Sequence, residues 1–425
     1  MALENEETDS AMGPYQVLDL TEGGFNWSSK VLADMRADVI KVEPLGGSAT
    51  RLRGPFYKDE VHPERSLFWY AYCLNKRGIT LNLESPDGQQ LFRELAASAD
   101  FVMESFPPGY MDNLGIGYKD LSRLNPGLIM SSITPFGQTG PHARYKATDI
   151  VAWSMGGMQY VGGDEDRPPV EISFPQAELH AGAQAAAGAM VAFWRRQRTG
   201  AGQQVDVSMQ EAIIWCLMGA TSFPPLHDIN AERAGAYRKM GFLVYRGVYP
   251  CADGYISALV IGGVLGGKSM TALVQWMYEE GAAPDFMKER DWYNWDTADV
   301  AAQGEDGMRD VQAVQNVAGD FFATKTKAEL YERAVTDRIL IAPCNTVQDI
   351  WESPQLKARD FWVEVYHPEL DVPIHYMGPY IGMSKTPIKV RRRAPLISEH
   401  NQEIYVRELG LAKERLEELK KAGVV

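Results

Sequence analysis

The sequence predicts an α/β protein with a Rossmann-like parallel sheet in a large domain and a smaller α/β domain beside it. In the first 210 residues, short apolar runs alternate with amphipathic segments of about 10–15 residues, which is typical of βαβ units. The chain has 425 residues, of which 45% are hydrophobic and 23% are charged. A chain of this length and composition can form more than one domain, each with its own core.

The apolar and amphipathic runs of the first half define its expected elements in order. Strands are predicted at 15–20, 37–43, 78–83, 100–105, 128–133 and 203–208. Helices are predicted at 26–36, 85–99, 177–197 and 209–220. The helix at 85–99 begins with a capping Ser85 and has Pro86 at its first helical position. Small residues fill the helix at 177–197, which indicates close packing against another backbone.

A polar, turn-rich segment separates this half from the rest of the chain. We therefore divide the chain into four parts: the N-terminal part of the large domain (1–221), a linker (222–241), the small domain (242–350), and a linker with the return to the large domain (351–425). The small domain is expected to contain a hairpin at ADGY, a strand at 255–261, a helix at 270–280 and a mostly helical stretch at 304–335. Strands at 372–383 and an amphipathic helix at 413–423 follow.

Charge and composition restrict the partners of the protein. A formal net charge of −14 argues against nucleic acid or an anionic membrane as the main partner. No apolar run reaches the ~20 residues that span a bilayer, and the acidic N-terminus does not resemble a secretory signal. The four cysteines are scattered without metal-ligand spacing. We therefore expect a cytoplasmic protein with reduced thiols and no metal site.

Residues 262–269, GGVLGGKS, match the phosphate-binding P-loop pattern. Three observations argue against a nucleotide site there. The chain offers no strand ending in an acidic residue at a position suited to hold Mg²⁺, the match lies in the smaller domain, and the preceding strand begins in a hairpin. We interpret the stretch as a glycine-rich turn between a strand and a helix. Nucleotide binding that is lost in Lys268→Ala would favour the P-loop alternative.

Eight sequence blocks occur in a characteristic order along the chain. They are GPYQVLDLT (13–21), ADVIKVEPLGG (37–47), NKRGITLNL (75–83), FPPGYMDNLGIGY (106–118), LNPGLIMSSITPFGQTGP (124–141), RTGAGQQVDVSMQEA (198–212), PCNTVQDI (343–350) and RAPLISEH (393–400). This succession resembles the family III CoA-transferases over about residues 13–411. The family includes formyl-CoA transferase, carnitine CoA-transferase and α-methylacyl-CoA racemase. The resemblance implies ring-shaped chains interlocked in a dimer.

The resemblance implies covalent catalysis by a carboxylate. In the transferases the carboxylate attacks an acyl-CoA such as succinyl-CoA, and anhydride and enzyme–CoA thioester intermediates pass CoA to a carboxylic acid. The CoA thioester is a substrate, and no permanently bound cofactor is expected. The family nucleophile is an Asp, and its position here is Glu178, in SFPQAELHAG. The chain is expected either to use Glu178 itself or to be a degenerate subunit that pairs with an Asp-bearing paralogue.

Both alternatives imply a second chain. The partner is either an identical copy or a paralogous subunit, because the family includes heteromers such as the succinyl-CoA:benzylsuccinate CoA-transferases. A racemase is the less favoured activity. Racemases of the family use a His-Asp pair, whereas the matched stretch ATD places Thr148 at the His position. A Thr hydroxyl cannot abstract an α-proton near neutral pH. Asp149 remains and is expected to orient Glu178 or its helix.

The resemblance also implies a set of positions that contact CoA. They are Gly24, Leu81, Ser105, Phe106, Asn113, Leu114 and Lys146. Leu81, Phe106 and Lys146 keep the residue types of the formyl-CoA transferase-like members, and Leu114 replaces a Met. Other positions lose charge or polarity: Asn113 and Pro44 replace arginines, Glu84 replaces a lysine, Ser105 replaces an Asn, and Gly23-Gly24 and Asn26-Trp27 replace Val-Gln and Gly-Pro. Lys76, Arg77 and Arg144 are candidate substitutes for the lost cations.

Overall fold

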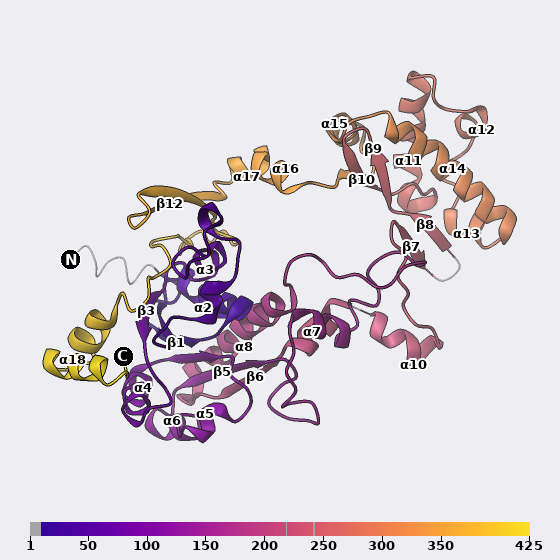
Figure 1. Cartoon of the computed structure of the whole chain (residues 1–425). Helices are drawn as coiled ribbons and strands as arrows, with labels where there is room; N and C mark the ends of the chain where they lie inside the picture. Colours follow the sequence, from indigo (N-terminus) through magenta and orange to yellow (C-terminus); the bar gives the residue numbers. More distant parts are fainter. Residues whose placement is uncertain (1–9, 218, 241–242) are drawn as a thin grey trace. The chain divides into compact units, whose positions relative to one another are not determined.

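A computed structural model describes residues 10–217, 219–240 and 243–425 (Figure 1). The chain forms two compact units. The first contains the described residues up to Met158 together with Ile172–Ser222 and Pro354–Val425. The second contains Gln159–Glu171 and Phe223–Ser353. Each unit has its own hydrophobic core.

A six-stranded parallel sheet forms the centre of the first unit, with the order β3-β2-β1-β4-β5-β6. Its strands are β1 (Gln16–Leu20), β2 (Asp38–Glu43), β3 (Arg77–Thr80), β4 (Phe101–Glu104), β5 (Ile129–Thr134) and β6 (Gln204–Ser208). The predicted parallel sheet is confirmed. Strand β1 pairs with both β2 and β4, so the strand order reverses there. In open α/β sheets, ligands bind beyond the carboxyl ends of the strands at such a reversal.

Helices cover both faces of this sheet (Figure 1). One face packs on α4 (Pro86–Ser98), α6 (Tyr118–Leu124) and α18 (Lys413–Lys421). The other packs on α2 (Asn26–Asp34), α7 (Asp149–Met155), α8 (Ala177–Thr199) and α9 (Met209–Ile214). Neighbouring residues of β1 point to opposite faces: Leu18 joins the first cluster and Val17 the second. Further elements of this unit are α3 (Leu67–Tyr72), α5 (Tyr110–Asn113), α17 (Pro354–Ala358) and a hairpin of β12 (Trp362–His367) and β13 (Val372–Met377).

Helix α8 packs closely on the start of α2, as its small residues predict. Ala181, Ala185 and Ala189 recur at the four-residue spacing of one helix face and are fully buried. A Cβ added at Gly182 would lie 3.3 Å from the backbone oxygen of Gly24. The small residues therefore bring the first turns of α8 against the loop that follows β1.

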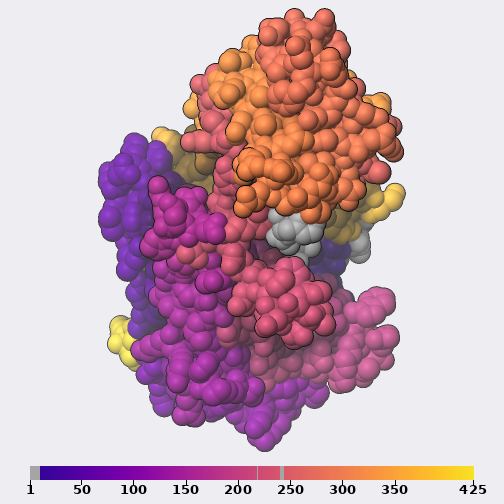
Figure 2. Space-filling model, turned by 90° about the vertical axis from the view of Figure 1, so that its right-hand side faces the viewer, coloured from indigo at the N-terminus to yellow at the C-terminus, as the bar shows by residue number. Residues whose placement is uncertain are grey.

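The second unit contains a three-stranded antiparallel sheet with the order β11-β10-β9. The strands are β9 (Val248–Cys251), β10 (Gly254–Ala258) and β11 (Ile341–Pro343), which confirms the hairpin predicted at ADGY. Its other elements are α10 (Phe223–His227), β7 (Tyr237–Met240), β8 (Leu243–Arg246), α11 (Gly263–Glu279), α12 (Asp285–Lys288), α13 (Thr297–Ala301), α14 (Glu305–Ala323), α15 (Lys327–Asp337) and α16 (Val347–Glu352). Figure 2 shows the orange residues of this unit, which include α14 and α15, packed into one body.

The turn predicted at 262–269 is wrong, because α11 already begins at Gly263. A Cβ at Gly266 would lie 1.9 Å from the backbone oxygen of Ile261, and one at Gly267 would lie 2.7 Å from Cα of Tyr293. These glycines allow the helix to contact neighbouring backbone directly. The hydroxyl of Ser269, the residue that a P-loop directs at Mg²⁺, accepts a hydrogen bond from the N–H of Leu340 (2.9 Å). This geometry argues against a phosphate-binding loop.

Two predicted boundaries in the first unit also shift. The strand predicted at 78–83 begins at Arg77 and ends at Thr80. The helix predicted at 209–220 ends at Ile214 and continues as a 3-10 turn over Trp215–Leu217, while residue 218 lies outside the described residues.

Candidate active site

Glu178 lies in the first turn of α8, and its carboxylate is enclosed by groups of the first unit. The N–H of Gly24 donates to Oε2 of Glu178 at 2.7 Å. The guanidinium of Arg53 donates to both carboxylate oxygens, to Oε2 at 2.6 Å and to Oε1 at 2.8 Å. The residue is only 8% exposed. The carboxylate is therefore held in one orientation by three hydrogen bonds, two of them from a cation.

Two glycines leave room for this carboxylate. Gly23 and Gly24 form the 3-10 turn η1 (Gly23–Phe25), directly beyond the carboxyl end of β1. A Cβ at Gly23 would lie 2.6 Å from Oε2 of Glu178, and one at Gly24 would lie 2.7 Å from Cβ of Glu178. Gly23 also has a φ of +58°, which L side chains rarely adopt. A side chain at either position would displace Glu178 or the turn.

Asp149, at the start of α7, fixes the beginning of α8. Its Oδ2 accepts a hydrogen bond from the N–H of Gln176 (3.0 Å), and its Oδ1 accepts one from the N–H of Glu178 (3.0 Å). The first N–H groups of a helix have no partner within the helix, so a carboxylate at this place stabilises it. Asp149 thus orients the helix that carries Glu178, as the sequence predicted. Thr148 is exposed.

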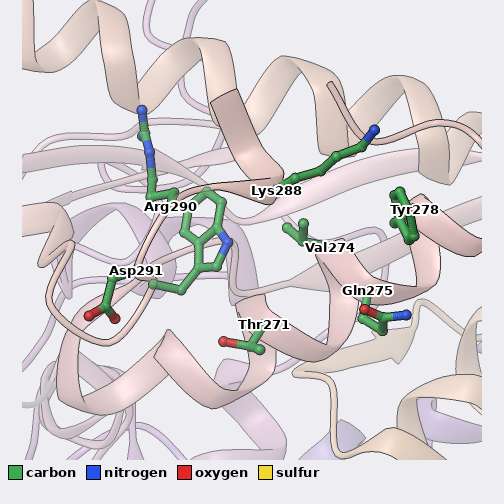
Figure 3. A pocket seen from close by; sticks show the side chains of 8 residues that line it. Thr271, Val274, Gln275, Tyr278, Lys288, Arg290 and Asp291 are labelled. Atoms are coloured by element: carbon green, nitrogen blue, oxygen red, sulfur yellow. The ribbon is translucent and has the colours of Figure 1, made fainter. Parts of the chain in front are cut away.

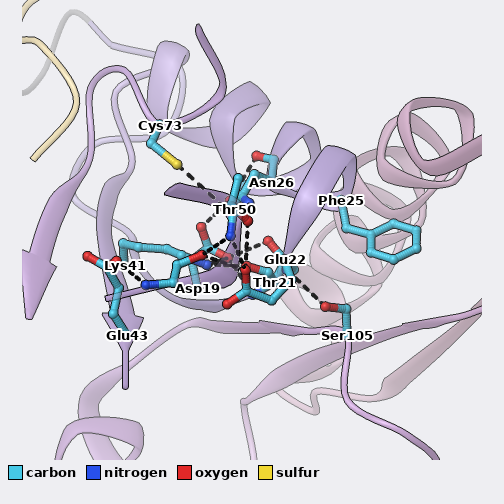
Figure 4. Close-up of polar contacts among 12 residues, drawn as sticks. Asp19, Thr21, Glu22, Phe25, Asn26, Lys41, Glu43, Thr50, Cys73 and Ser105 are labelled. Carbon is cyan, nitrogen blue, oxygen red and sulfur yellow. Dashed lines mark hydrogen bonds and ion pairs between the residues drawn. The ribbon is translucent and has the colours of Figure 1, made fainter. Parts of the chain in front are cut away.

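A buried polar cluster supports the loop of residues 21–26, which we call the glycine loop (Figure 4). At its centre, Asp19 accepts hydrogen bonds from the Thr21 hydroxyl (2.6 Å), the Ser29 hydroxyl (2.7 Å) and Nζ of Lys76 (2.8 Å). Nζ of Lys41 lies 3.6 Å from Asp19, and all three charged side chains are fully buried. Burial alone would raise the pKa of Asp19, but Lys41 and Lys76 hold it well below its usual range.

The glycine loop is also tied at successive residues. The Thr50 hydroxyl accepts from the N–H of Gly23 (2.7 Å) and donates to the carboxylate of Glu22 (2.6 Å). Asn26 donates to the backbone oxygen of Gly23 (3.0 Å). The Ser105 hydroxyl accepts from the N–H of Glu22 (2.9 Å) (Figure 4). These bonds fix the N–H of Gly24 toward Glu178.

The structure brings some of the predicted CoA positions to this site and leaves others apart. Gly24 contacts Glu178, and Ser105 binds the glycine loop. The ring of Phe106 stacks on that of Tyr110 (4.6 Å between centroids). Leu114 packs partly buried against the core, Leu81 lies 2% exposed within it, and Asn113 and Lys146 are exposed.

Two of the three candidate substitute cations are engaged elsewhere, which corrects the expectation that they serve CoA. Lys76 belongs to the buried polar cluster. Arg77 pairs with Asp38, Glu403 and Glu408. Arg144 is exposed. Arg53 is the site residue that sequence reasoning missed, since it lies 125 residues from Glu178 and no motif connects the two.

The second unit has a hollow of its own, between α11 and residues 288–292 (Figure 3). Its volume is about 590 Å³. Lys288 lies over the ring of Tyr278 (4.7 Å from Nζ to the centroid), and Arg290 pairs with Asp310 (2.9 Å). None of the predicted site residues lines this hollow. We therefore do not assign it to the candidate active site.

In the part of the chain that the structure describes, no group of three or more His, Cys, Asp or Glu side chains is arranged to hold a metal ion. None of its helices combines the length and the apolar character that crossing a bilayer requires.

Comparisons with known proteins identify the family. Residues 15–401 match the family model of CoA-transferase family III. The chain is 34% identical to the succinyl-CoA:(R)-benzylsuccinate CoA-transferase subunit BbsE of Thauera aromatica, covering 97% of both chains. It is 32% identical to a succinyl-CoA–D-citramalate CoA-transferase of Chloroflexus aurantiacus, covering 93% of both. A crystal structure of a CAIB/BAIF family protein from Brucella suis superimposes with a TM-score of 0.78 at 27% identity, covering 94% of this chain and 99% of that one.

The chain therefore belongs to CoA-transferase family III and is a CoA-transferase. The resemblance stated from the eight sequence blocks is confirmed. Gly23, Gly24 and Glu178, where the sequence analysis expected departures from the family pattern, prove to be in direct contact. The longer Glu side chain uses space that residues larger than glycine would fill.

Proposed function

We propose that this chain transfers CoA from an acyl-CoA such as succinyl-CoA to a carboxylic acid, with Glu178 as the nucleophile. The observation that carries the proposal is the unequal bonding of the two carboxylate oxygens. Oε2 accepts two hydrogen bonds, from Gly24 and Arg53, whereas Oε1 accepts one, from Arg53. Oε1 keeps a lone pair for attack, while Oε2 is held by a backbone donor.

This arrangement suits each step of carboxylate catalysis. Oε1 attacks the thioester carbonyl carbon, the C–S bond breaks, and the CoA thiolate leaves a mixed anhydride on Glu178. The thiolate then attacks Cδ of Glu178, the Cδ–Oε1 bond breaks, and the donor acid departs with Oε1 as a carboxylate. Negative charge develops on Oε2 during this second attack, where the N–H of Gly24 stabilises it as in an oxyanion hole.

The acceptor acid completes the cycle by the same chemistry in reverse. Its carboxylate attacks Cδ of the Glu178–CoA thioester, and the thiolate leaves and then attacks the acceptor carbonyl of the new anhydride. The C–O bond of that carbonyl breaks, which releases acyl-CoA and regenerates the Glu178 carboxylate. No metal or redox cofactor enters this balance.

Hydroxylamine trapping tests the assignment of Glu178. The purified chain is incubated with succinyl-CoA and hydroxylamine, and peptides are analysed by mass spectrometry. We expect a hydroxamate on Glu178, and none in Glu178→Gln. Absence of the adduct from the chain, both alone and with a paralogous partner, would refute the nucleophile assignment.

A second candidate role is that of a subunit without its own nucleophile. The similarity to BbsE, which is named as a subunit, favours it. In this case transferase activity appears only with an Asp-bearing paralogue, and the adduct forms on that partner. In either role we propose a dimer, formed by two copies or by paralogous chains. The four free cysteines fit the proposed cytoplasmic location.

A further inference from the structure

Arg53 occupies a special position beside the carboxylate. It follows the 3-10 turn η2 (Ala49–Leu52), and its backbone oxygen accepts a hydrogen bond from the Ser66 hydroxyl (2.5 Å). Its side chain is 40% exposed, whereas that of Glu178 is 10% exposed. The guanidinium therefore stands between Glu178 and solvent, in contact with both.

Other nearby carboxylates are already satisfied. Glu22 accepts hydrogen bonds from Thr50, and Asp149 accepts two from the backbone N–H groups of Gln176 and Glu178. Among the hydrogen bonds and ion pairs of the described residues, those of the Arg53 guanidinium go to Glu178. Any step that neutralises Glu178 thus removes the counter-ion of Arg53.

The proposed function contains such a step. In the enzyme–CoA thioester Glu178 is neutral, and the free carboxylate of the donor or acceptor acid is beside it. The departing acid carries Oε1, the oxygen that Arg53 holds at 2.8 Å in the resting site. An acceptor must place its attacking oxygen at the same point, because the acceptor step is the reverse of the donor step.

We propose that Arg53 is the carboxylate-binding residue of this site. It pairs with Glu178 in the resting enzyme and with the carboxylate of the donor or acceptor acid while Glu178 carries CoA. The planar fork of a guanidinium matches either carboxylate with two hydrogen bonds. This inference rests on the proposed function, and it identifies the group that recognises the acid in it.

Succinate binding by calorimetry tests the exchange of partners without requiring turnover. Glu178→Gln keeps the side-chain length and removes the charge, as the thioester does. We expect it to bind succinate about tenfold or more tightly than the wild type, because charge-assisted hydrogen bonds to Arg53 become available. The double variant Glu178→Gln/Arg53→Gln should lose this gain.

Arg65 provides a matched control, since it is an arginine of the same region paired with Glu60 and not with Glu178. Glu178→Gln/Arg65→Gln should bind succinate as Glu178→Gln does. The proposal is overturned if Glu178→Gln gains no affinity, or if its gain survives the loss of Arg53. Thermal melting checks that each variant is folded.

A second measurement uses the unmodified Glu178 and covers the case in which the Gln variants do not fold. The assay is the exchange of labelled succinate into succinyl-CoA, and the variant is Arg53→Lys. This variant keeps the positive charge but loses the planar guanidinium that donates two hydrogen bonds to one carboxylate. We expect the KM for succinate to rise about tenfold, with a smaller effect on the KM for succinyl-CoA. Equal KM values in Arg53→Lys and the wild type would overturn the proposal. A binding gain without a Glu178 hydroxamate would support the carboxylate site and refute the nucleophile.

Discussion

Replacing Gly24 by alanine tests whether the glycine loop sets the position of Glu178. The new Cβ would lie 2.7 Å from Cβ of Glu178, whereas nonbonded carbon atoms are best separated by about 3.5–4.0 Å. Both atoms are fixed by their backbones, so the loop and α8 must move apart by about 1 Å. A displacement of ~1 Å at the reacting group can reduce the rate about 100-fold.

The assay is the initial rate of hydroxamate formation on Glu178 with succinyl-CoA, with the partner chain present if transfer requires one. Gly46→Ala is the control, because a Cβ there has nothing within 4 Å. We expect the control to keep the wild-type rate and Gly24→Ala to lose about 100-fold. A Gly24→Ala rate within threefold of the wild type would show that the close contact does not position the carboxylate.

Three further substitutions test the surroundings of the site. Asp149→Ala should lower the free energy of unfolding by about 1 kcal/mol, because the N–H groups of Gln176 and Glu178 at the start of α8 lose their acceptor. An unchanged free energy of unfolding in urea denaturation would contradict this. Lys76→Met should cost about 3–5 kcal/mol in the same assay, because it breaks a buried ion pair with Asp19; a loss under 1 kcal/mol would mean that Lys41 alone compensates Asp19. Burial raises the pKa of Glu104 to about 7, above the ~4.3 of an unfolded Glu, so the wild type loses stability as the pH rises from about 4 through 7. The free energy of unfolding of Glu104→Gln should therefore rise relative to that of the wild type as the pH increases over this range, and should not rise further above pH 7. Urea denaturation between pH 5 and 8 measures this difference. If the difference between the two proteins does not depend on pH, the raised pKa of Glu104 is refuted.

The parallel sheet could be predicted from the sequence because its strands and helices are coded locally. Each strand is a short apolar run, and the helices between them carry their own caps, such as Ser85, whose hydroxyl accepts from the N–H of Gly88 (3.0 Å). The place of Glu178 in the first turn of a helix could also be predicted, because the run of small residues that forms α8 begins at Ala177. These signals lie within single segments of the chain.

The contacts that define the site could not be predicted in this way, because they join distant segments. Arg53 meets Glu178 across 125 residues, and Lys76 meets Asp19 across 57. A lysine in a sequence suggests a surface position, and only a buried acidic partner makes Lys76 tolerable in the core. The turn predicted at GGVLGGKS (262–269) is wrong for the same reason. Its glycines pack against the backbone around Tyr293, and no local sequence pattern reveals this contact.

The buried polar cluster that supports the glycine loop has consequences for heat inactivation of this enzyme and for the evolution of its substrate choice. Loosening the loop to admit a different acid would break contacts among Asp19, Lys41 and Lys76, none of which reaches solvent. Inactivation by heat is therefore expected to coincide with unfolding, rather than to precede it through local melting. If Glu178 and Arg53 act as proposed, changes of acceptor acid during evolution should accumulate around the exposed side of Arg53, where substitutions leave the contacts that hold Glu178 intact.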